Sequence, residues 1–235
     1  MNVFRNIFGK KYDHHIRLST SDFNDYFDRT EFNGTPLTYL LLGELSVSSG
    51  KIIACDPLVY FNNSLPFIKK VKAGKYPVTV CIAKTKNSGD SYAIVKLEFS
   101  KTKTTKWELA ITNGQNVNDL KDDGEFFGFP IASGLGCFMD LQTRQFFNEF
   151  VDSFMRENPD CNIYDDFFAY EFKKNAIDQN DPKDAGDWIN FYLPNEPELN
   201  VIMFHSGFGD GVYPSYWGTN DSGEICNLVV DFGVI

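Results

Sequence analysis

The sequence predicts an α+β fold: a mainly antiparallel β-sheet or sandwich with a two-helix insertion packed on one side. Three observations support this prediction. Short β-rich runs separated by Gly, Pro, Asn and Asp fill the first half, two stripes of aromatic residues at helical spacing follow, and β-rich runs resume before the C-terminus. The 235 residues suit one domain, 1–235, with residues 1–15 as a loosely packed N-terminal segment.

The first half is mostly extended. Between residues 91 and 99, Tyr92, either Ile94 or Val95, and Leu97 point to one side of the run and Lys96 to the other. This alternation, although irregular, is typical of a half-buried strand. The turn residues between the runs separate five strands. The expected strands are Leu37–Val47, Lys51–Cys55, Tyr76–Ala83, Ser91–Phe99 and Lys106–Thr112.

Three helices are expected. Thr143–Asn158 carries six large apolar residues on one helical stripe, and either Asp140 or Thr143 can cap its start. Asn162–Asn175 repeats the aromatic stripe, with acidic residues in its first turn and lysines in its last, as the helix dipole favours. Ser21–Arg29 is a shorter helix before the first strand.

The C-terminal part returns to strands. Lys174–Asp187 is polar and contains proline and glycine, so we expect an exposed loop. Thr219–Gly223 has the Asn, Asp and Gly residues of a hairpin turn. The expected strands are Leu199–His205, Val212–Gly218 and Glu224–Val234.

The charge is acidic and uneven. The formal net charge is −10, which argues against nucleic acid or an anionic membrane as the main partner. No apolar run reaches the roughly 18 residues that a membrane span needs. Residues 1–110 hold 16 basic and 10 acidic side chains, whereas residues 111–235 hold 6 and 22. The two halves either form distinct surfaces or interleave, so that the charges mix.

The cysteines predict a reducing compartment. There are five, an odd number, and none forms a C-x-x-C pair. We therefore expect reduced thiols in the cytoplasm, with no disulfide framework, no metal site and no cofactor. Residues 1–15 also lack the uninterrupted apolar stretch of a secretory signal.

A glycine-rich stretch, residues 133–140, leads into the long predicted helix. Gly134 and Gly136 could expose backbone N–H groups to an anion, although the spacing matches neither a P-loop nor G-x-G-x-x-G. Cys137 near a helix start could have a lowered pKa, with His205 as its base. Asp140 adds a carboxylate to the stretch, and the default interpretation of Cys137 remains a buried structural thiol.

Residues 205–218 are the densest candidate. Gly207, Gly209 and Gly211 lie within five residues at the end of a strand, so the loop needs unusual backbone angles. Asp210 between them either accepts N–H groups of its own loop or faces a ligand or cation. The EF-hand spacing is absent.

Two further carboxylates break local rules. Asp56 precedes a proline at a strand end, and Asp231 lies inside an apolar strand where a buried acid must find a partner. The candidate ligand-binding or functional cluster is Asp56, Cys137, Asp140, His205, Asp210 and Asp231. Its loop-forming residues are Gly134, Gly136, Gly207, Gly209 and Gly211.

The order of these motifs resembles the bacterial family catalogued as domain of unknown function 4241. The resemblance runs from residues 50–58 (GKIIACDPL) to 228–232 (LVVDF). Between them lie 74–78, 107–110, 128–131, 133–140, 206–211, 213–214 and 216–218. The resemblance implies a soluble bacterial protein and supplies no catalytic residues. Ala132 departs from the acidic residue that we expect there, which weakens acid-based chemistry at that turn.

These observations favour a non-enzymatic protein-interaction module of the immunity or antitoxin kind. Its acidic half would bind a basic protein partner through aromatic anchors. The 209–214 turn is also similar to loops of small bacterial proteins found beside toxin systems, an analogy of fold only. One alternative is a ligand-binding or metal-binding protein, or a hydrolase-type enzyme, that uses the Asp/Gly-rich loops. Another is that the motifs only close hairpins and tie loops.

Overall fold

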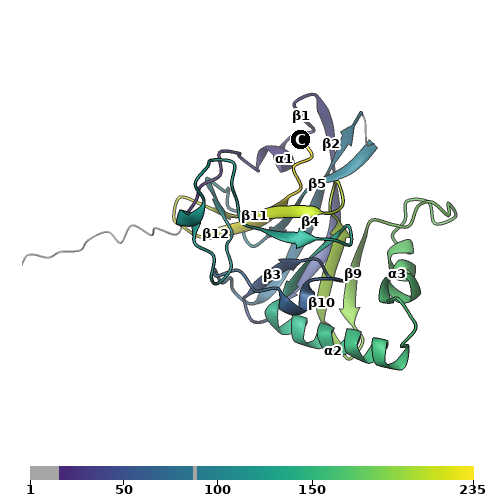
Figure 1. Cartoon of the computed structure of the whole chain (residues 1–235). Coiled ribbons are helices and arrows are strands. Elements are labelled where there is room, and N and C mark those ends of the chain that lie inside the picture. The colour runs from purple at the N-terminus through teal and green to yellow at the C-terminus, as the bar shows by residue number, and fades with distance from the viewer. Residues whose placement is uncertain (1–15, 87–88) are drawn as a thin grey trace, which may run out of the picture.

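The computed structural model describes residues 16–86 and 89–235, so the N-terminal segment 1–15 lies outside the described residues. The fold class predicted from the sequence is confirmed: two antiparallel sheets lie face to face, and helices cover one side (Figure 1). None of the described helices is both long and apolar enough to cross a lipid bilayer.

The large sheet contains both early and late parts of the chain. The strand order is β1-β2-β4-β5-β12-β11-β6, and β7 pairs with β11. The C-terminal strand β12 therefore lies in the middle of the sheet, between its hairpin partner β11 and the distant strand β5. The bounds are β1 Glu31–Phe32, β2 Thr35–Val47, β4 Gly74–Thr85, β5 Gly89–Glu98, β6 Lys106–Leu109, β7 Gly128–Ile131, β11 Gly211–Thr219 and β12 Ile225–Asp231.

The small sheet has the order β3-β8-β10-β9, with bounds β3 Ile52–Cys55, β8 Leu135–Asp140, β9 Trp188–Leu193 and β10 Glu196–His205. Both of its faces are buried. Along β8, Phe138 faces the large sheet, whereas Cys137 and Met139 face the helices. Continuous apolar runs replace the usual alternation here because each face packs against another layer.

A buried amide joins the two sheets at one edge. Asn200 of β10 is fully buried, and its side chain accepts the N–H of Ser46 at 2.8 Å and donates to the carbonyl of Glu44 at 2.8 Å. Its amide also donates to Asn190 Oδ1 at 2.6 Å. These bonds fix the position of β10 against β2, because a buried amide without partners costs free energy.

The helical layer, residues 141–187, covers the outer face of the small sheet. It contains α2 Leu141–Glu157, a π-helical turn Tyr164–Phe168 and α3 Ala169–Lys173. Phe147, Phe168 and Phe172 are fully buried against the sheet. The predicted two-helix insertion is therefore present, and its second helix begins as a wider turn.

The remaining helices are short. Only Asp25–Asp28 of the expected helix 21–29 is helical (α1), and two 3₁₀ turns are η1 Phe61–Asn63 and η2 Val117–Asp119. Phe23 and Tyr26 pack on the outer face of the large sheet, so the 16–32 segment covers part of that face. Tertiary packing therefore holds this segment even though its helix is one turn long.

Sequence reasoning missed four strands: β1, β7, β8 and β9. Residues 135–140 are strand β8, so their interpretation as a glycine-rich turn is wrong. The run is buried on both faces and has no alternation, which is why periodicity could not identify it.

A bulge explains the irregular alternation in β5. Cys81 pairs with Ile94 and Ile82 with Tyr92, which leaves Ala93 as an extra residue. Tyr92 therefore faces the sandwich core, whereas Ile94 faces the outer side.

Candidate functional site

The turns predicted from glycine and aspartate do meet at one end of the sandwich. We define the loop cluster as residues 56–59, 132–134 and 206–210, which follow β3, β7 and β10. Side chains from the first and third loops both bind the second, as described next. These three distant bends therefore converge.

Asp56 ties the first two loops together. Its carboxylate is fully buried, and Oδ1 accepts the backbone N–H groups of Leu58 and Val59 at 2.8 and 2.9 Å. Oδ2 accepts those of Ala132 and Ser133, both at 2.9 Å. Four charge-assisted bonds compensate the burial of the charge and leave little capacity for a ligand. The bond to Ala132 uses the backbone, so it does not require an acidic side chain there.

The glycine loop binds the same turn from the other side. Ser206 Oγ lies 3.0 Å from the carbonyl oxygen of Gly134 and 2.7 Å from that of Gly209. The N–H of Gly134 donates to Asp210 Oδ1 at 3.2 Å. Asp210 itself is exposed, so one of its oxygens faces solvent.

Backbone geometry explains two of the glycines in this loop. Gly207 has φ +65°, and a Cβ there would lie 2.8 Å from the carbonyl oxygen of Tyr92 and 2.9 Å from Phe232 Cβ. Gly209 has φ +91° but open space around it. Gly207 is therefore required for close packing on the large sheet, whereas Gly209 is required only for its backbone angle.

His205 ends β10 on the side of the helical layer. Its Nδ1 lies 3.6 Å from Asp187 Oδ1, and its ring lies 6.4 Å from that of Phe172. The imidazole is about half exposed, at 45%. Sequence reasoning missed Asp187 as its neighbour, because the sequence does not show that the end of the 174–187 loop pairs with β10.

Cys137 is a buried structural thiol. It lies within β8 and not at a helix start, and its Sγ is 3.6 Å from Cys55 Sγ on the neighbouring strand. Burial, followed by the nearby Cys55 thiol, raises the pKa of Cys137 well above its ordinary value. The expectation of a lowered pKa is therefore wrong, and so is the pairing with His205.

Asp140 lies at the opposite end of β8 from Gly134. It caps α2 by accepting the N–H of Gln142 at 2.8 Å, and its oxygens also accept the hydroxyl groups of Ser48 and Ser49 at 3.1 and 2.9 Å. The predicted cap is confirmed. Asp140 does not belong to the loop cluster, because the length of the strand separates them.

Asp231 faces the outer side of the large sheet, near Tyr26 and Tyr216. The one hydrogen bond that its carboxylate receives from described residues is the N–H of Gly233 at 2.9 Å. Burial raises the pKa of Asp231. Burial, and then the charge of Asp231, raises the pKa of each tyrosine to about 12. The six candidate residues thus do not form one cluster.

Most of the chain matches a known protein family. The model of the family described as Protein of unknown function (DUF4241) matches residues 45–230. The chain belongs to this family. No curated protein and no solved structure matches it.

The DUF4241 span contains all three loops of the cluster, the small sheet and the helical layer, whereas Asp231 lies just beyond it. Within residues 16–86 and 89–235, no group of three or more His, Cys, Asp or Glu side chains is placed to hold a metal ion. The loop cluster is therefore a hydrogen-bonded framework whose polar groups are mostly paired with one another.

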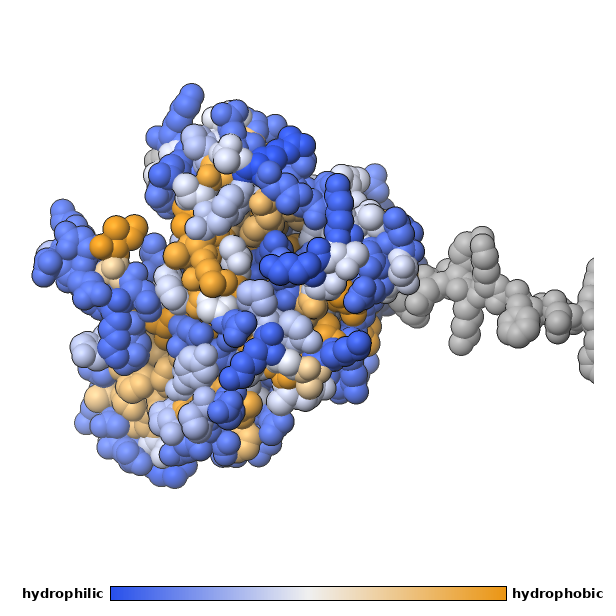
Figure 2. All heavy atoms as spheres, turned by 180° about the vertical axis from the view of Figure 1, so that it is seen from behind, coloured by the Kyte–Doolittle hydropathy of each residue, from blue (hydrophilic) through white to orange (hydrophobic). Residues whose placement is uncertain are grey.

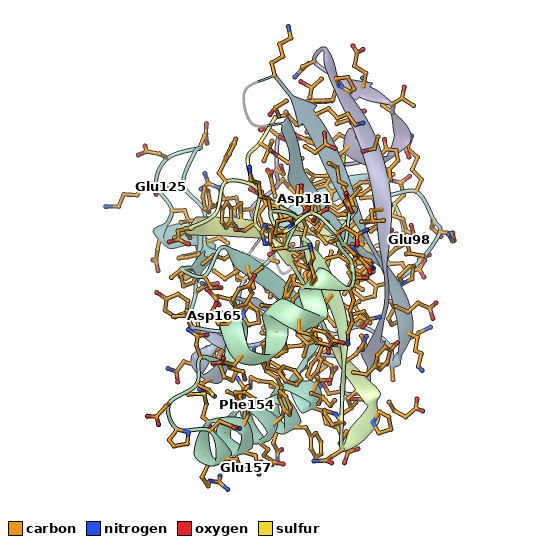
Figure 3. The ribbon with its side chains drawn as sticks, turned by 90° about the vertical axis from the view of Figure 1, so that its right-hand side faces the viewer. Glu98, Glu125, Phe154, Glu157, Asp165 and Asp181 are labelled. Carbon is orange, nitrogen blue, oxygen red and sulfur yellow. The ribbon has the colours of Figure 1, made fainter. Side chains whose placement is uncertain are left out.

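The helical layer has an excess of acidic side chains. Residues 141–187 contain 11 acidic and 5 basic side chains. In Figure 3 this layer lies toward the viewer, and the labelled Glu157, Asp165 and Asp181 are spread over it. The layer thus holds half of the 22 acidic side chains of residues 111–235, and the other half belong to the strands and loops outside it.

Internal contacts occupy several of the basic groups. Lys173 Nζ is enclosed by backbone carbonyls of the 174–187 loop, including that of Asp178 at 3.5 Å. Lys174 Nζ pairs with Glu171 at 2.6 Å. Arg144 donates to the carbonyl of Ser64. These cations stabilise the layer itself, and acidic side chains still outnumber basic ones in it by 11 to 5.

Proposed function

We propose that this protein is a non-enzymatic interaction module of the immunity or antitoxin kind, and that its helical layer binds a basic protein partner. The observation that carries the proposal is the excess of 11 acidic over 5 basic side chains in one layer of the fold. A surface of one sign steers an oppositely charged partner and disfavours partners of like charge.

A groove beside α2 gives the layer a place to hold a basic side chain. It has a volume of about 360 Å³ and lies between α2 and the turn joining β9 to β10. Phe150 and Phe154 contribute apolar walls, and Glu149, Glu157 and Glu196 contribute carboxylates. A lysine or arginine of the partner would pack its aliphatic stem on the rings and place its charge among the carboxylates.

Exposed apolar side chains supply contact area next to these charges. Tyr170 is 70% exposed, and Met155 at the end of α2 is 37% exposed. Aromatic residues of this kind often carry much of the binding energy in protein interfaces. The reduced, buried thiols suit a module that works in the cytoplasm.

The test is capture from the native host followed by titration of the purified partner. A double variant, Asp152→Lys with Asp160→Lys, reverses two exposed charges of the helical layer. The matched control, Glu31→Lys with Asp90→Lys, makes the same change in charge on the large sheet.

We expect a basic partner whose affinity falls at least tenfold in the first variant and by less than about threefold in the control, with strong salt dependence. A partner that binds both variants equally would refute the proposal. So would the failure of any basic protein to bind at low salt.

A further inference from the structure

A cavity of about 280 Å³ opens beside the sandwich core, outside both the loop cluster and the helical layer. Its walls come from β3 and the segment that follows it, from the loop after β6, from β7 and from β11. Ala54 and Ala110 are buried at its base, whereas Tyr60 and Leu65, 38% and 50% exposed, lie at its mouth. The cavity therefore has a route to solvent.

Small side chains create this space. On β11, Tyr213, Ser215 and Trp217 all point toward the sandwich core, because alternate residues of a strand share one face. The two aromatic residues fill their positions, but Ser215 does not, and the residue lining the cavity from β3 is Ala54. The small side chains at these two positions leave the space open.

Ser215 brings an unpaired hydroxyl group to the cavity. The residue is 2% exposed, and its Oγ has no hydrogen-bond partner among the described residues. A buried hydroxyl without a partner costs free energy, and strands that face a core ordinarily carry Val or Ile at such positions. The hydroxyl is thus placed to bond to something that enters the cavity.

The lining also restricts the chemistry of the occupant. None of the residues that line the cavity carries a charged side chain. The aromatic residues Tyr60, Phe67, Phe127 and Phe129 favour a flat ring. A cavity of about 150 Å³ holds benzene, so nearly twice that volume suits two fused rings. We propose that this cavity binds a neutral, planar aromatic molecule with a hydrogen-bonding group that pairs with Ser215. The polar residues Asn63, Ser64, Thr112 and Gln115 also line the cavity.

The test compares two ring systems of the same shape. Indole has an N–H that can donate to Ser215 Oγ, whereas indene lacks it. Titration of the whole chain, followed by calorimetry and NMR, is expected to show indole binding roughly 2- to 12-fold more tightly than indene, the range of one net hydrogen bond. No binding of indole up to its solubility limit would overturn the proposal.

Variants assign the binding to this cavity. Ser215→Ala is expected to remove the preference for indole, and Ala110→Leu, which fills the space, is expected to abolish binding of both rings. Ser46→Ala is the matched control, because Ser46 Oγ is also buried and unpaired but does not line the cavity.

A preference for indole that persists in Ser215→Ala, as it is expected to persist in the control Ser46→Ala, overturns the assignment. If Ala110→Leu does not fold, Ser215→Val fills the same cavity from the neighbouring strand, and indole binding that persists in it equally refutes the proposal. Neither outcome depends on a protein partner, so this test is independent of the proposed function.

Discussion

Replacing Asp56 by asparagine tests the framework that joins the loops. The carboxylate accepts two N–H groups on each oxygen: those of Leu58 and Val59 on Oδ1, and those of Ala132 and Ser133 on Oδ2. An asparagine has one oxygen and one NH₂ group. Whichever way its amide is oriented, two backbone donors therefore lose their acceptor and face another donor.

The magnitude follows from the number of bonds lost. A hydrogen bond to a charged group contributes about 1.5–3 kcal/mol, so the loss of two lowers the free energy of unfolding by roughly 3–6 kcal/mol. That is a large part of the about 5–15 kcal/mol available to a typical domain. Asp56 is fully buried, so water cannot replace the lost acceptor without opening the loops.

Urea denaturation followed by circular dichroism measures this effect. The control is Asp210→Asn, because Asp210 is exposed and accepts one bond, at 3.2 Å from the N–H of Gly134, which an amide oxygen can also accept. We expect the control to lie within about 0.5 kcal/mol of the native protein. A loss below about 1 kcal/mol for Asp56→Asn, at an unchanged m-value, would refute the reasoning.

Three further predictions concern stability and reactivity. Asp231→Asn is expected to stabilise the protein by up to about 2 kcal/mol at pH 7, because burial raises the pKa of Asp231. Protonation of Asp231 removes the cost of burying its charge, so this gain in stability should shrink as the pH falls below its pKa. A gain that is independent of pH in thermal melts would contradict the prediction. Gly207→Ala should lower the free energy of unfolding by about 2–4 kcal/mol, and Gly209→Ala by about 1–2 kcal/mol. Both residues have a positive φ, but a Cβ at Gly207 also meets the large sheet. Equal losses of stability would show that this contact is not limiting. Thiol alkylation of the native protein, mapped by mass spectrometry, should modify Cys161 first, because it is the one partly exposed cysteine and the other four are buried. Early labelling of a buried cysteine would argue against the packing described.

The fold class could be predicted because its signals are local. The aromatic stripe of α2 and the cap at Asp140 depend on residues within a few positions of one another, and both are present in the structure. The same holds for three of the five loop glycines, since Gly134, Gly207 and Gly209 have a positive φ. Gly136 and Gly211 instead lie in strands β8 and β11, so their assignment to loops is wrong.

The irregular alternation in β5 marks the limit of this approach. The sequence left open whether Ile94 or Val95 faces the core, because a bulge shifts the phase by one residue and no local pattern records it. β8 was missed for a related reason: a strand buried on both faces has no periodicity to detect.

What the sequence by itself determined is thus the set of helices and most strands, the acidic second half and the positions of the tight turns. The tertiary structure alone decided that β12 lies between β5 and β11, that Asp56 bonds to a turn 76 residues away, and that Ser215 borders a cavity. The physical reason is that these features depend on contacts between segments distant in the chain, whose energies appear only when the two sheets pack together.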